Sequence, residues 1–457
     1  MKNRYIVNII ISIVVAIVTS LITISIMSKK YNKSIINYYS NPVKGKQVSY
    51  QNSDYNIGNE SFSKIVKKIQ PSTVFIQSKT INNFGVAKLE TGTGIILTPD
   101  GYIVTNAHVI NDSEEITVRN YIGQEYKGEI VGIDNYSDIA VIKVNMENSQ
   151  FIFIQNSNTI EVGDLTLVFG NPMNLQNSVS HGIISAKNRN LNILGSEGIE
   201  SFIQTDALAT SGNSGGPLIN INGEMIGMVT AINIDEKESK SFTFAIPSNI
   251  VRKIAFDLIN YHTVNRAWMG LNVRNNEINK GIVIERVIPD SPASLAELQT
   301  GDLIYQVDTI EIENVPQFQA IIAEKSPGES IYMLISRDNK TLNKKIVLKN
   351  HLNTDEFISI RKDKILLDYG FELRDLTTKE MVEYNTNGVL VTSVIKNSLV
   401  DNSNIEPGYI IEKINGMKIS NVEKILEVLN SNPTTLEIIG IYKNYPGKFP
   451  YIIQNKR

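Results

Sequence analysis

Apolar positions along the chain follow two distinct spacings, and together these predict a mainly β protein. From residue 73 onward most apolar residues stand in short runs joined by tight turns, among them Pro99-Asp100-Gly101 and Asn222-Gly223. Runs on either side of such turns are typical of antiparallel hairpins. Helical spacing is found at 61–69, which ends at Pro71, and at 248–258, so we expect two helices that flank one β domain.

A long apolar stretch lies near the N-terminus. No charged residue occurs from Tyr5 to Met27, and 23 residues of α-helix extend about 35 Å, enough to cross a bilayer with some tilt. Because this stretch is longer than the apolar core of a signal peptide and no small-residue cleavage site follows, we expect an uncleaved transmembrane anchor at 1–30. Residues 31–60 are rich in Asn, Ser, Tyr and Lys, which is typical of a tether.

The last two hundred residues contain an internal repeat. Gly281-Ile282-Val283 recurs as Gly388-Val389-Leu390, and further matches follow at the same offset of 107 residues. A gap-free repeat of this length predicts two copies of one small domain, which we expect at 266–352 and 360–457.

Candidate chemistry begins with Ser214, which stands in the glycine-rich turn Gly212-Asn213-Ser214-Gly215-Gly216-Pro217. Glycines beside a nucleophilic serine allow main chain and substrate to approach closely, and backbone N–H groups can then bind an oxyanion. A plain glycine-rich hairpin is the alternative. The nucleophile elbow of α/β-hydrolases is excluded, because a helix must follow that serine, whereas here a hairpin follows.

A serine nucleophile needs a base, and the chain has four histidines, His108, His181, His262 and His351. His108 is the best candidate, since it follows a predicted hairpin and is flanked by apolar residues that would anchor it. The third group should be a carboxylate that orients the imidazole. Asp138 stands at the start of an apolar strand and is preferred to Asp134, whose neighbours predict a solvated turn.

Three motifs around these residues resemble those of one known family, the trypsin-like serine proteases of the HtrA (DegP/DegS) type with PDZ domains. The motifs are Thr105-Asn106-Ala107-His108-Val109, Ser137-Asp138-Ile139-Ala140-Val141 and Gly212-Asn213-Ser214-Gly215-Gly216-Pro217-Leu218. The resemblance implies a chymotrypsin-like double β-barrel protease domain at 61–262. It also implies that the two repeats are PDZ-like α+β domains, so that one transmembrane helix precedes three folded domains.

The resemblance also implies roles for individual residues. The catalytic triad would be His108, Asp138 and Ser214. The oxyanion hole would be formed by Gly212, Asn213 and Ser214. The pocket for the side chain before the cut would be lined by residues without charge, namely Leu208, Ala209, Thr230, Ala231 and Ile232. The loop of the first PDZ domain that binds a peptide carboxylate would be Trp268, Met269, Gly270 and Leu271.

One departure from the family pattern lies just before the serine motif. This chain has Leu208-Ala209-Thr210-Ser211 where the family usually has an Asn followed by Pro or Arg. A missing proline removes a fixed φ angle from the loop that shapes the oxyanion hole. We therefore expect a loop that needs ordering before it works.

The function that the resemblance implies is a membrane-anchored serine endopeptidase that degrades misfolded or exposed polypeptides by acyl-enzyme chemistry. Its first PDZ domain would bind peptide C-termini, and the protein would form a homotrimer or a multiple of trimers. The alternative is a protease-latent chaperone or PDZ scaffold that binds C-termini. The resemblance places the catalytic domain outside the cytoplasm, although Lys29, Lys30 and Lys33 after the anchor outnumber Lys2 and Arg4 before it.

Composition adds a few exclusions. The formal net charge is −3, which gives no reason to expect a nucleic-acid partner. The chain has no cysteine, so disulfides, thiol catalysis and thiolate metal sites are excluded. The expected chemistry needs no cofactor and no metal.

Overall fold

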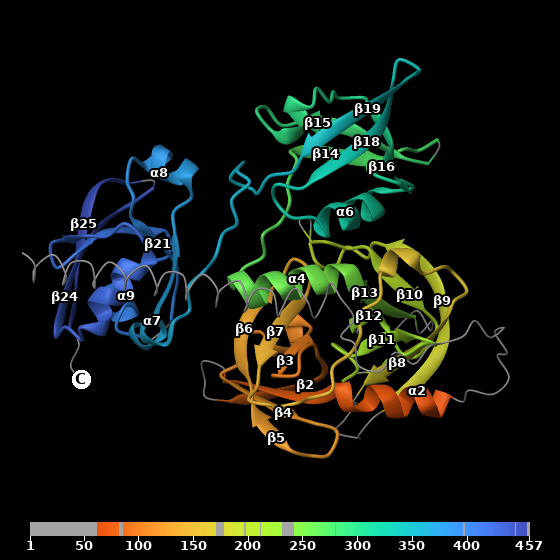
Figure 1. The fold of residues 1–457 in the computed structure, drawn as a ribbon, viewed down its shortest axis with the longest axis horizontal. Helices are drawn as coiled ribbons and strands as arrows, with labels where there is room; N and C mark the ends of the chain where they lie inside the picture. The colour runs from red at the N-terminus through yellow and green to blue at the C-terminus, as the bar shows by residue number, and fades with distance from the viewer. Residues whose placement is uncertain are drawn as a thin grey trace, which may run out of the picture. The chain divides into compact units, whose positions relative to one another are not determined.

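The computed structural model describes most of the chain from residue 62 onward (Figure 1). The described ranges are 62–81, 86–170, 178–195, 198–210, 212–230, 242–278, 280–395, 398–443 and 445–454. The expected anchor at 1–30 and tether at 31–60 lie outside them. Within the described ranges, no helix is both long enough and apolar enough to span a membrane.

The first β assembly is a seven-stranded antiparallel sheet with the order β5-β4-β1-β2-β3-β7-β6. Its strands are β1 Thr73–Ile81, β2 Ala87–Ile96, β3 Tyr102–Thr105, β4 Glu115–Arg119, β5 Glu125–Lys127, β6 Glu129–Asp134 and β7 Ile139–Lys143. The hairpin predicted around Pro99-Asp100-Gly101 is confirmed, because β2 pairs with β3. Gly101 has a φ of +94°, which favours glycine at that turn.

The second assembly is a closed barrel with the order β10-β13-β12-β11-β8-β9. Its strands are β8 Leu165–Gly170, β9 Ser178–Arg189, β10 Phe202–Thr205, β11 Pro217–Asn220, β12 Met225–Thr230 and β13 Thr243–Pro247. β11 and β12 form the hairpin predicted around Asn222-Gly223, directly after the Ser214 turn.

Of the two closed barrels expected, the second assembly is one, whereas the described strands of the first sheet form an open path. One end of that path is β5, with three residues, and the other end is β6, which packs against helix α4. A Cβ on Gly132 of β6 would lie 2.8 Å from Leu258 of α4, so the glycine gives the helix room at this edge.

Both predicted helices of this domain are present. They are α2 Phe62–Ile69 and α4 Ser248–Tyr261, and the short elements beside them are α3 Ala107–Ile110, η1 Gln70–Ser72 and η2 Ser157–Thr159. α4 buries Ile250, Val251, Ile254 and Leu258 in the same apolar core as Phe169 and Phe202 of the barrel strands. The helix therefore belongs to the domain of the two β assemblies rather than to the repeats that follow.

The first repeat follows the two β assemblies along the chain. It has a sheet with the order β14-β15-β16-β18-β19 and two short helices. Its elements are β14 Leu271–Asn275, β15 Ile282–Val287, α5 Pro292–Leu295, β16 Leu303–Val307, β17 Ile310–Glu311, α6 Val315–Ala323, β18 Ser330–Arg337 and β19 Lys340–Val347. β14 stands at the edge of this sheet, and its strand neighbour among the described residues is β15.

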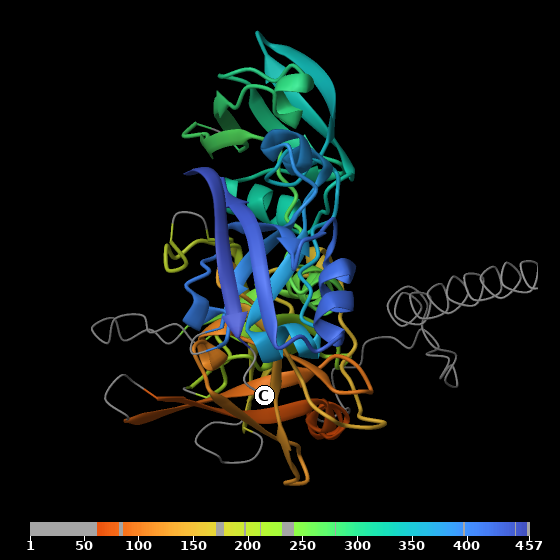
Figure 2. The same cartoon turned by 90° about the vertical axis from the view of Figure 1, so that its left-hand side faces the viewer.

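The second repeat, here called the C-terminal domain, has the matching sheet order β20-β21-β22-β24-β25. Its elements are α7 Lys364–Tyr369, β20 Phe371–Asp375, α8 Thr378–Tyr384, β21 Val389–Val394, η4 Asp401–Ser403, β22 Tyr409–Ile414, β23 Met417–Lys418, α9 Val422–Asn430, β24 Thr435–Tyr442 and β25 Tyr445–Gln454. The hairpin of β24 and β25 is the long dark blue pair in Figure 2. The two repeats thus share a topology, as their common residue spacing predicts.

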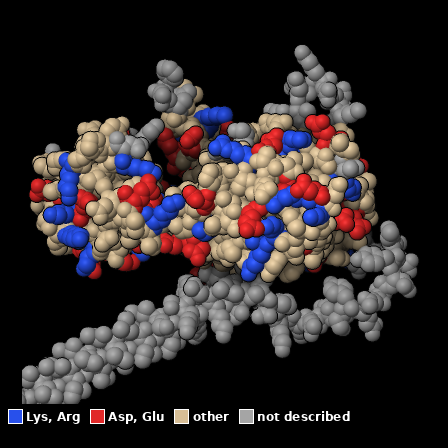
Figure 3. Space-filling view, turned by 90° about the horizontal axis from the view of Figure 1, so that it is seen from above, with Lys and Arg blue, Asp and Glu red and all other residues tan. Residues whose placement is uncertain are grey.

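Charged side chains are interspersed on the face seen in Figure 3, where basic and acidic residues alternate across the described surface. This mixture agrees with the small net charge of −3.

Candidate active site

His108 lies on α3, a four-residue helix that follows β3. Its neighbours Ala107, Val109 and Ile110 are buried, whereas the His108 side chain is 47% exposed. The apolar neighbours fix the backbone, and the imidazole is left at the surface, where a substrate can reach it. The anchoring expected from the sequence is therefore present.

Asp138 lies in the turn between β6 and β7 and faces His108. Its two carboxylate oxygens lie 2.8 and 3.0 Å from Nδ1 of His108. One of them also accepts a hydrogen bond from the backbone N–H of His108, at 3.0 Å. Asp138 is 7% exposed and has a φ of +55°, so the turn is held in a conformation that non-glycine residues rarely adopt.

This contact determines how the imidazole titrates. Burial disfavours the charged imidazole, but the hydrogen bond and the negative charge of Asp138 outweigh it, so the pKa of His108 lies above its ordinary value. Because the carboxylate faces Nδ1, that nitrogen carries the proton of the neutral ring. Nε2 is then the nitrogen that can act as a base.

The Ser214 turn packs against the strands that lead to His108. The backbone carbonyl of Ser214 accepts a hydrogen bond from the N–H of Thr93 on β2, at 2.8 Å. A Cβ on the next residue, Gly215, would lie 2.3 Å from Oγ1 of Thr105 and 3.2 Å from the backbone nitrogen of Asn106. The Ser214 turn therefore lies next to Thr105 and Asn106, which directly precede the helix of His108. Ser214 and His108 are 106 residues apart in the sequence.

The backbone of the expected oxyanion loop is also fixed by neighbours. Gly212 has a φ of +97°, and its carbonyl accepts a hydrogen bond from Oγ1 of Thr93, at 2.7 Å. The N–H of Asn213 donates to the carbonyl of Thr210, at 3.0 Å. A Cβ on Gly170 would lie 2.0 Å from Oδ1 of Asn213, so glycine at 170 leaves space for this buried amide.

Three of the residues expected around the specificity pocket are described. Leu208 is 50% exposed, and its carbonyl accepts a hydrogen bond from Oγ of Ser180, at 2.6 Å. The N–H of Ala209 donates to Oγ1 of Thr243, at 2.9 Å. Ala231 and Ile232 lie outside the described residues.

Thr230 has a contact that sequence reasoning missed. Its hydroxyl donates to Oδ2 of Asp138, at 3.1 Å. The residue was expected in the pocket wall, and no local feature of the sequence pairs it with a carboxylate 92 residues earlier. The bond helps to hold the Asp138 carboxylate in its orientation toward His108.

Asn135 and Tyr136 lie exposed in a turn, as expected, but their neighbour Asp134 is buried. The residue is 5% exposed, and its Oδ2 accepts hydrogen bonds from Oγ of Ser137 and from the guanidinium of Arg266. The Arg266 guanidinium also lies 5.0 Å above the ring of Tyr136. Arg266, located after α4, thus contacts two residues of the segment that leads to Asp138.

The expected carboxylate-binding loop of the first repeat has a fixed backbone. The N–H and carbonyl of Trp268 pair with Lys349, at 2.6 and 3.0 Å. The carbonyls of Met269 and Gly270 accept hydrogen bonds from the N–H groups of Ala293 and Ile288, both at 2.9 Å. Gly270 has a φ of +79°, and the loop runs directly into the edge strand β14 at Leu271.

Comparisons with known proteins identify the family of the chain. The family model of the trypsin-like peptidase domain matches residues 92–228, and that of the PDZ domain matches residues 258–336. The probable periplasmic serine endoprotease DegP-like of Chlamydia trachomatis is 33% identical over 75% of this chain and 70% of its own length. The periplasmic serine endoprotease DegP of Salmonella typhimurium is 31% identical over 76% of this chain and 73% of its own length.

A solved structure gives the same result. The HtrA-type protease AlgW with tripeptide is 30% identical to this chain, with a TM-score of 0.51, over 64% of this chain and 97% of its own. The chain therefore belongs to the DegP/HtrA family of trypsin-like serine endoproteases with a PDZ domain.

Proposed function

We propose that this chain is a membrane-anchored endopeptidase that degrades misfolded or exposed polypeptides outside the cytoplasm, with His108, Asp138 and Ser214 as its catalytic triad. The observation that carries the proposal is the contact of the Asp138 carboxylate with Nδ1 and the backbone N–H of His108. The Ser214 turn is bound to the neighbouring strand β2 through Thr93. These are the three groups that acyl transfer by a serine requires.

In the proposed mechanism, Nε2 of His108 accepts the proton of the Ser214 hydroxyl while Oγ attacks the scissile carbonyl carbon. The N–H groups of Gly212 and Ser214 donate to the oxyanion that forms. The imidazolium then gives its proton to the leaving amine nitrogen as the C–N bond breaks. Water, activated by the same imidazole, releases the acyl group from Ser214 and restores the hydroxyl.

The proposed location rests on two observations. The relatives from Chlamydia trachomatis and Salmonella typhimurium are named periplasmic. The uncharged stretch from Tyr5 to Met27 is long enough for a membrane anchor. Protease treatment of intact cells tests this proposal, because an external catalytic domain is degraded whereas a cytoplasmic one is protected.

The first repeat is proposed to bind peptide C-termini through Trp268, Met269, Gly270 and Leu271. β14 ends its sheet, and an extended peptide can add to such an edge by main-chain hydrogen bonds. Solved relatives are described with a tripeptide or a decapeptide. We also propose that the second repeat is a PDZ domain, from its matching topology, and that the protein assembles as a trimer or a multiple of trimers.

Casein hydrolysis by the full chain and by its Ser214→Ala variant tests the catalytic proposal. A nucleophile that works as one unit with its base should lose about 10⁶ in rate when it is removed. Equal rates in the two proteins would reject the proposal and favour a protease-latent chaperone or scaffold.

A further inference from the structure

Asn106 directly precedes the helix of His108, and its side chain is bound to Asp138. The residue is fully buried, and its Nδ2 donates a hydrogen bond to the backbone carbonyl of Asp138, at 3.0 Å. The N–H of Ala107 donates to the same carbonyl, at 3.2 Å. Residues 106, 107 and 108 thus each hold one part of Asp138, since the N–H of His108 binds its carboxylate.

Helix capping does not explain this side chain. Asn106 occupies the N-cap position of α3, where the oxygen of an asparagine ordinarily accepts a hydrogen bond from a backbone N–H of the first turn. In the described helix the side chain makes no such bond. Its Oδ1 is buried and accepts no hydrogen bond from any described residue, which lowers stability. The amide is therefore oriented for the carbonyl of Asp138 and not for the helix.

The residue that receives this bond has an unfavourable backbone conformation. Asp138 has a φ of +55°, in the left-handed region that residues with a Cβ rarely adopt. The direction of its carboxylate depends on this conformation, because the Cα–Cβ bond turns with the backbone. Two donors on the carbonyl of Asp138 therefore favour the conformation in which its carboxylate faces Nδ1 of His108.

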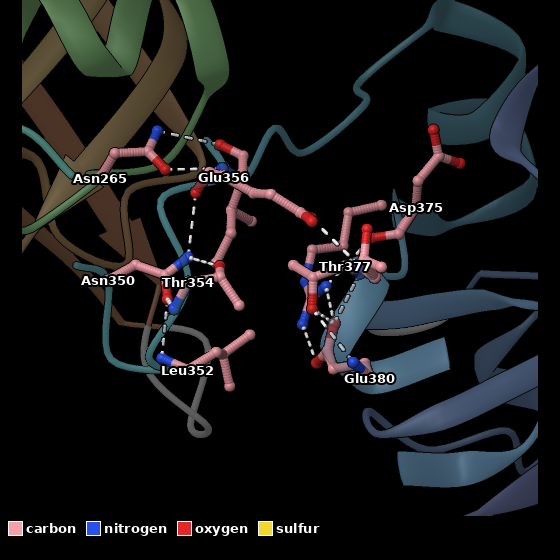
Figure 4. A network of polar contacts seen from close by, with 11 residues as sticks. Asn265, Asn350, Leu352, Thr354, Glu356, Asp375, Thr377 and Glu380 are labelled. Atoms are coloured by element: carbon pink, nitrogen blue, oxygen red, sulfur yellow. Dashed lines mark hydrogen bonds and ion pairs between the residues drawn. The ribbon is translucent and has the colours of Figure 1, made fainter. Parts of the chain in front are cut away.

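The entry of the same turn is held by a different part of the chain. Arg266 binds the carboxylate of Asp134, four residues before Asp138. The neighbour of Arg266 belongs to a polar network (Figure 4), in which the side-chain amide of Asn265 pairs with the backbone of Ile358, at 2.6 and 2.9 Å. These contacts do not involve residue 106, so we expect the entry of the turn to stay in place when that residue is changed.

We propose that Asn106 is a positioning residue for catalysis, whose amide keeps Asp138 in the left-handed conformation from which the carboxylate orients His108. This role rests on the proposed triad and adds a fourth side chain to it. Because Asn106 is fully buried, it acts through Asp138 and not on the substrate. Its loss should therefore slow the chemical step and leave substrate binding and the fold nearly intact.

Asn106→Leu tests the proposal in the full chain. Leucine has methyl groups where asparagine has its oxygen and nitrogen, so the variant removes the amide and the unpaired oxygen without leaving a cavity. The carbonyl of Asp138 keeps the N–H of Ala107 as a partner, so we expect the melting temperature to stay within a few degrees of the native value. The kcat for a peptide substrate should fall by about tenfold to a hundredfold, with KM unchanged.

The pH profile provides a readout that a purely structural role would not change. Burial disfavours the charged form of His108, but the contact with Asp138 and the negative charge of Glu90 raise its pKa above the ordinary value. If the carboxylate of Asp138 turns away, the pKa of His108 falls, while Glu90 is unaffected. The midpoint of kcat/KM should therefore move to lower pH in Asn106→Leu.

Asn111→Leu is the matched control. Asn111 lies directly after α3, and its Nδ2 donates to Oδ1 of Asn135, at 2.9 Å, so it also ties the helix to the turn before Asp138. This bond does not contact Asp138 itself, so the control should keep the native kcat and the native midpoint. Native kcat and midpoint in Asn106→Leu, or losses of equal size in the two variants, would overturn the proposal.

NMR titration of the full chain with Ser214→Ala is a second test, which needs neither hydrolysis nor a change at residue 106. Because Nδ2 of Asn106 and Nδ1 of His108 are bound to the same residue, the side-chain amide protons of Asn106 should shift with the midpoint of the His108 ring. Amide protons that do not follow this titration would reject the inference.

The proposed function is tested separately. Casein hydrolysis at the native rate by the Ser214→Ala chain would reject the triad, whereas the NMR titration would still report on Asn106. Hydrolysis that is lost with Ser214→Ala but keeps its native kcat and midpoint in Asn106→Leu would reject the role of Asn106 alone.

Discussion

Asp138 receives hydrogen bonds from Nδ1 and the backbone N–H of His108 and from the hydroxyl of Thr230. Three donors around one carboxylate fix its position and thereby the orientation of the imidazole. Sequence reasoning selected Asp138 and His108 because each lies beside an apolar run that would anchor it. It could not identify Thr230, because the bond depends on how two β assemblies pack.

The raised pKa of His108 predicts the pH dependence of activity. The base must be neutral, so kcat/KM should rise with pH through the pKa of the free enzyme. Because that pKa lies above the ordinary histidine value, we expect the midpoint above about 6.5. A pH profile of peptide hydrolysis measures it, and a midpoint at or below the ordinary value would contradict the assignment.

A matched histidine provides the control for this profile. Burial is the main cause that lowers the pKa of His262, which lies outside the site. His262→Gln should therefore leave the midpoint in place. Asp138→Asn should reduce kcat by about 10⁴, because the imidazole then loses the partner that sets its tautomer.

Arg266 is a positioning residue for Asp138. It binds the buried carboxylate of Asp134 and covers Tyr136, so Arg266→Ala should loosen the turn and lower kcat/KM by roughly ten- to hundredfold. Adding Asp134→Asn should restore part of the loss, because a neutral amide needs no guanidinium partner.

Kinetics of the single and double variants check this prediction, and Arg252→Ala on the exposed side of α4 is the control. If Arg266 only stabilised the fold, thermal stability would fall while kcat/KM of the folded protein stayed constant. That outcome would remove its positioning role.

At the scale of elements, loops from both β assemblies meet at the candidate site, and glycines allow them to approach. Gly215 has a φ of +83°, and a Cβ there would lie 2.2 Å from the carbonyl oxygen of Thr93 and 2.3 Å from Oγ1 of Thr105. The glycine-rich turn could be recognised in the sequence, because nucleophilic serines need such freedom. The residues of β2 and β3 that contact this turn could not be identified from the sequence.

Gly215→Ala should therefore displace Ser214 and lower casein hydrolysis by at least about a hundredfold. Gly123→Ala is the matched control, since Gly123 has a φ of +87° but nothing lies within 4 Å of its added Cβ. The control should cost about 1 kcal/mol of local strain and leave hydrolysis unchanged. Equal activity in both variants would mean that the contact with β2 and β3 is unimportant for the nucleophile.

Another loop beside the site is organised by one side chain. The Glu200 carboxylate accepts hydrogen bonds from four successive backbone N–H groups, those of Leu191, Asn192, Ile193 and Leu194. A further hydrogen bond, from the N–H of Ile199 to the carbonyl of Tyr136, joins this loop to the turn of Asp138. The sequence contains no signal for a carboxylate that closes its own loop.

At the scale of the whole molecule, the internal repeat is the sequence signature of domain organisation that the structure bears out. The repeat with its offset of 107 residues predicted two domains of one topology, and two such sheets are present. Contacts between domains have no such signature. Glu324 at the end of α6, for example, accepts hydrogen bonds from Asn158 and Asn249, which are 166 and 75 residues away.

Glu324 makes the stability of this junction depend on pH. Burial is the largest cause, and it raises the pKa of Glu324 above the ordinary value, although both amides favour the charged form. A carboxyl whose pKa is higher in the folded than in the unfolded protein binds more protons when folded. The ionisation of Glu324 therefore lowers the free energy of unfolding as the pH rises from about 4.5 through the raised pKa. The loss of stability remains at every pH above that pKa.

Glu324→Gln removes this penalty while it keeps an oxygen that both amides can donate to. We expect the variant to have the higher melting temperature at pH 7 and the two proteins to converge near pH 4, where Glu324 is protonated in both states. Thermal unfolding of the full chain across this range measures the difference. Glu329→Gln, at an exposed ion pair with Lys325, should show no such convergence. A difference between Glu324→Gln and the native chain that stays constant with pH would mean that the buried carboxyl does not titrate at this junction.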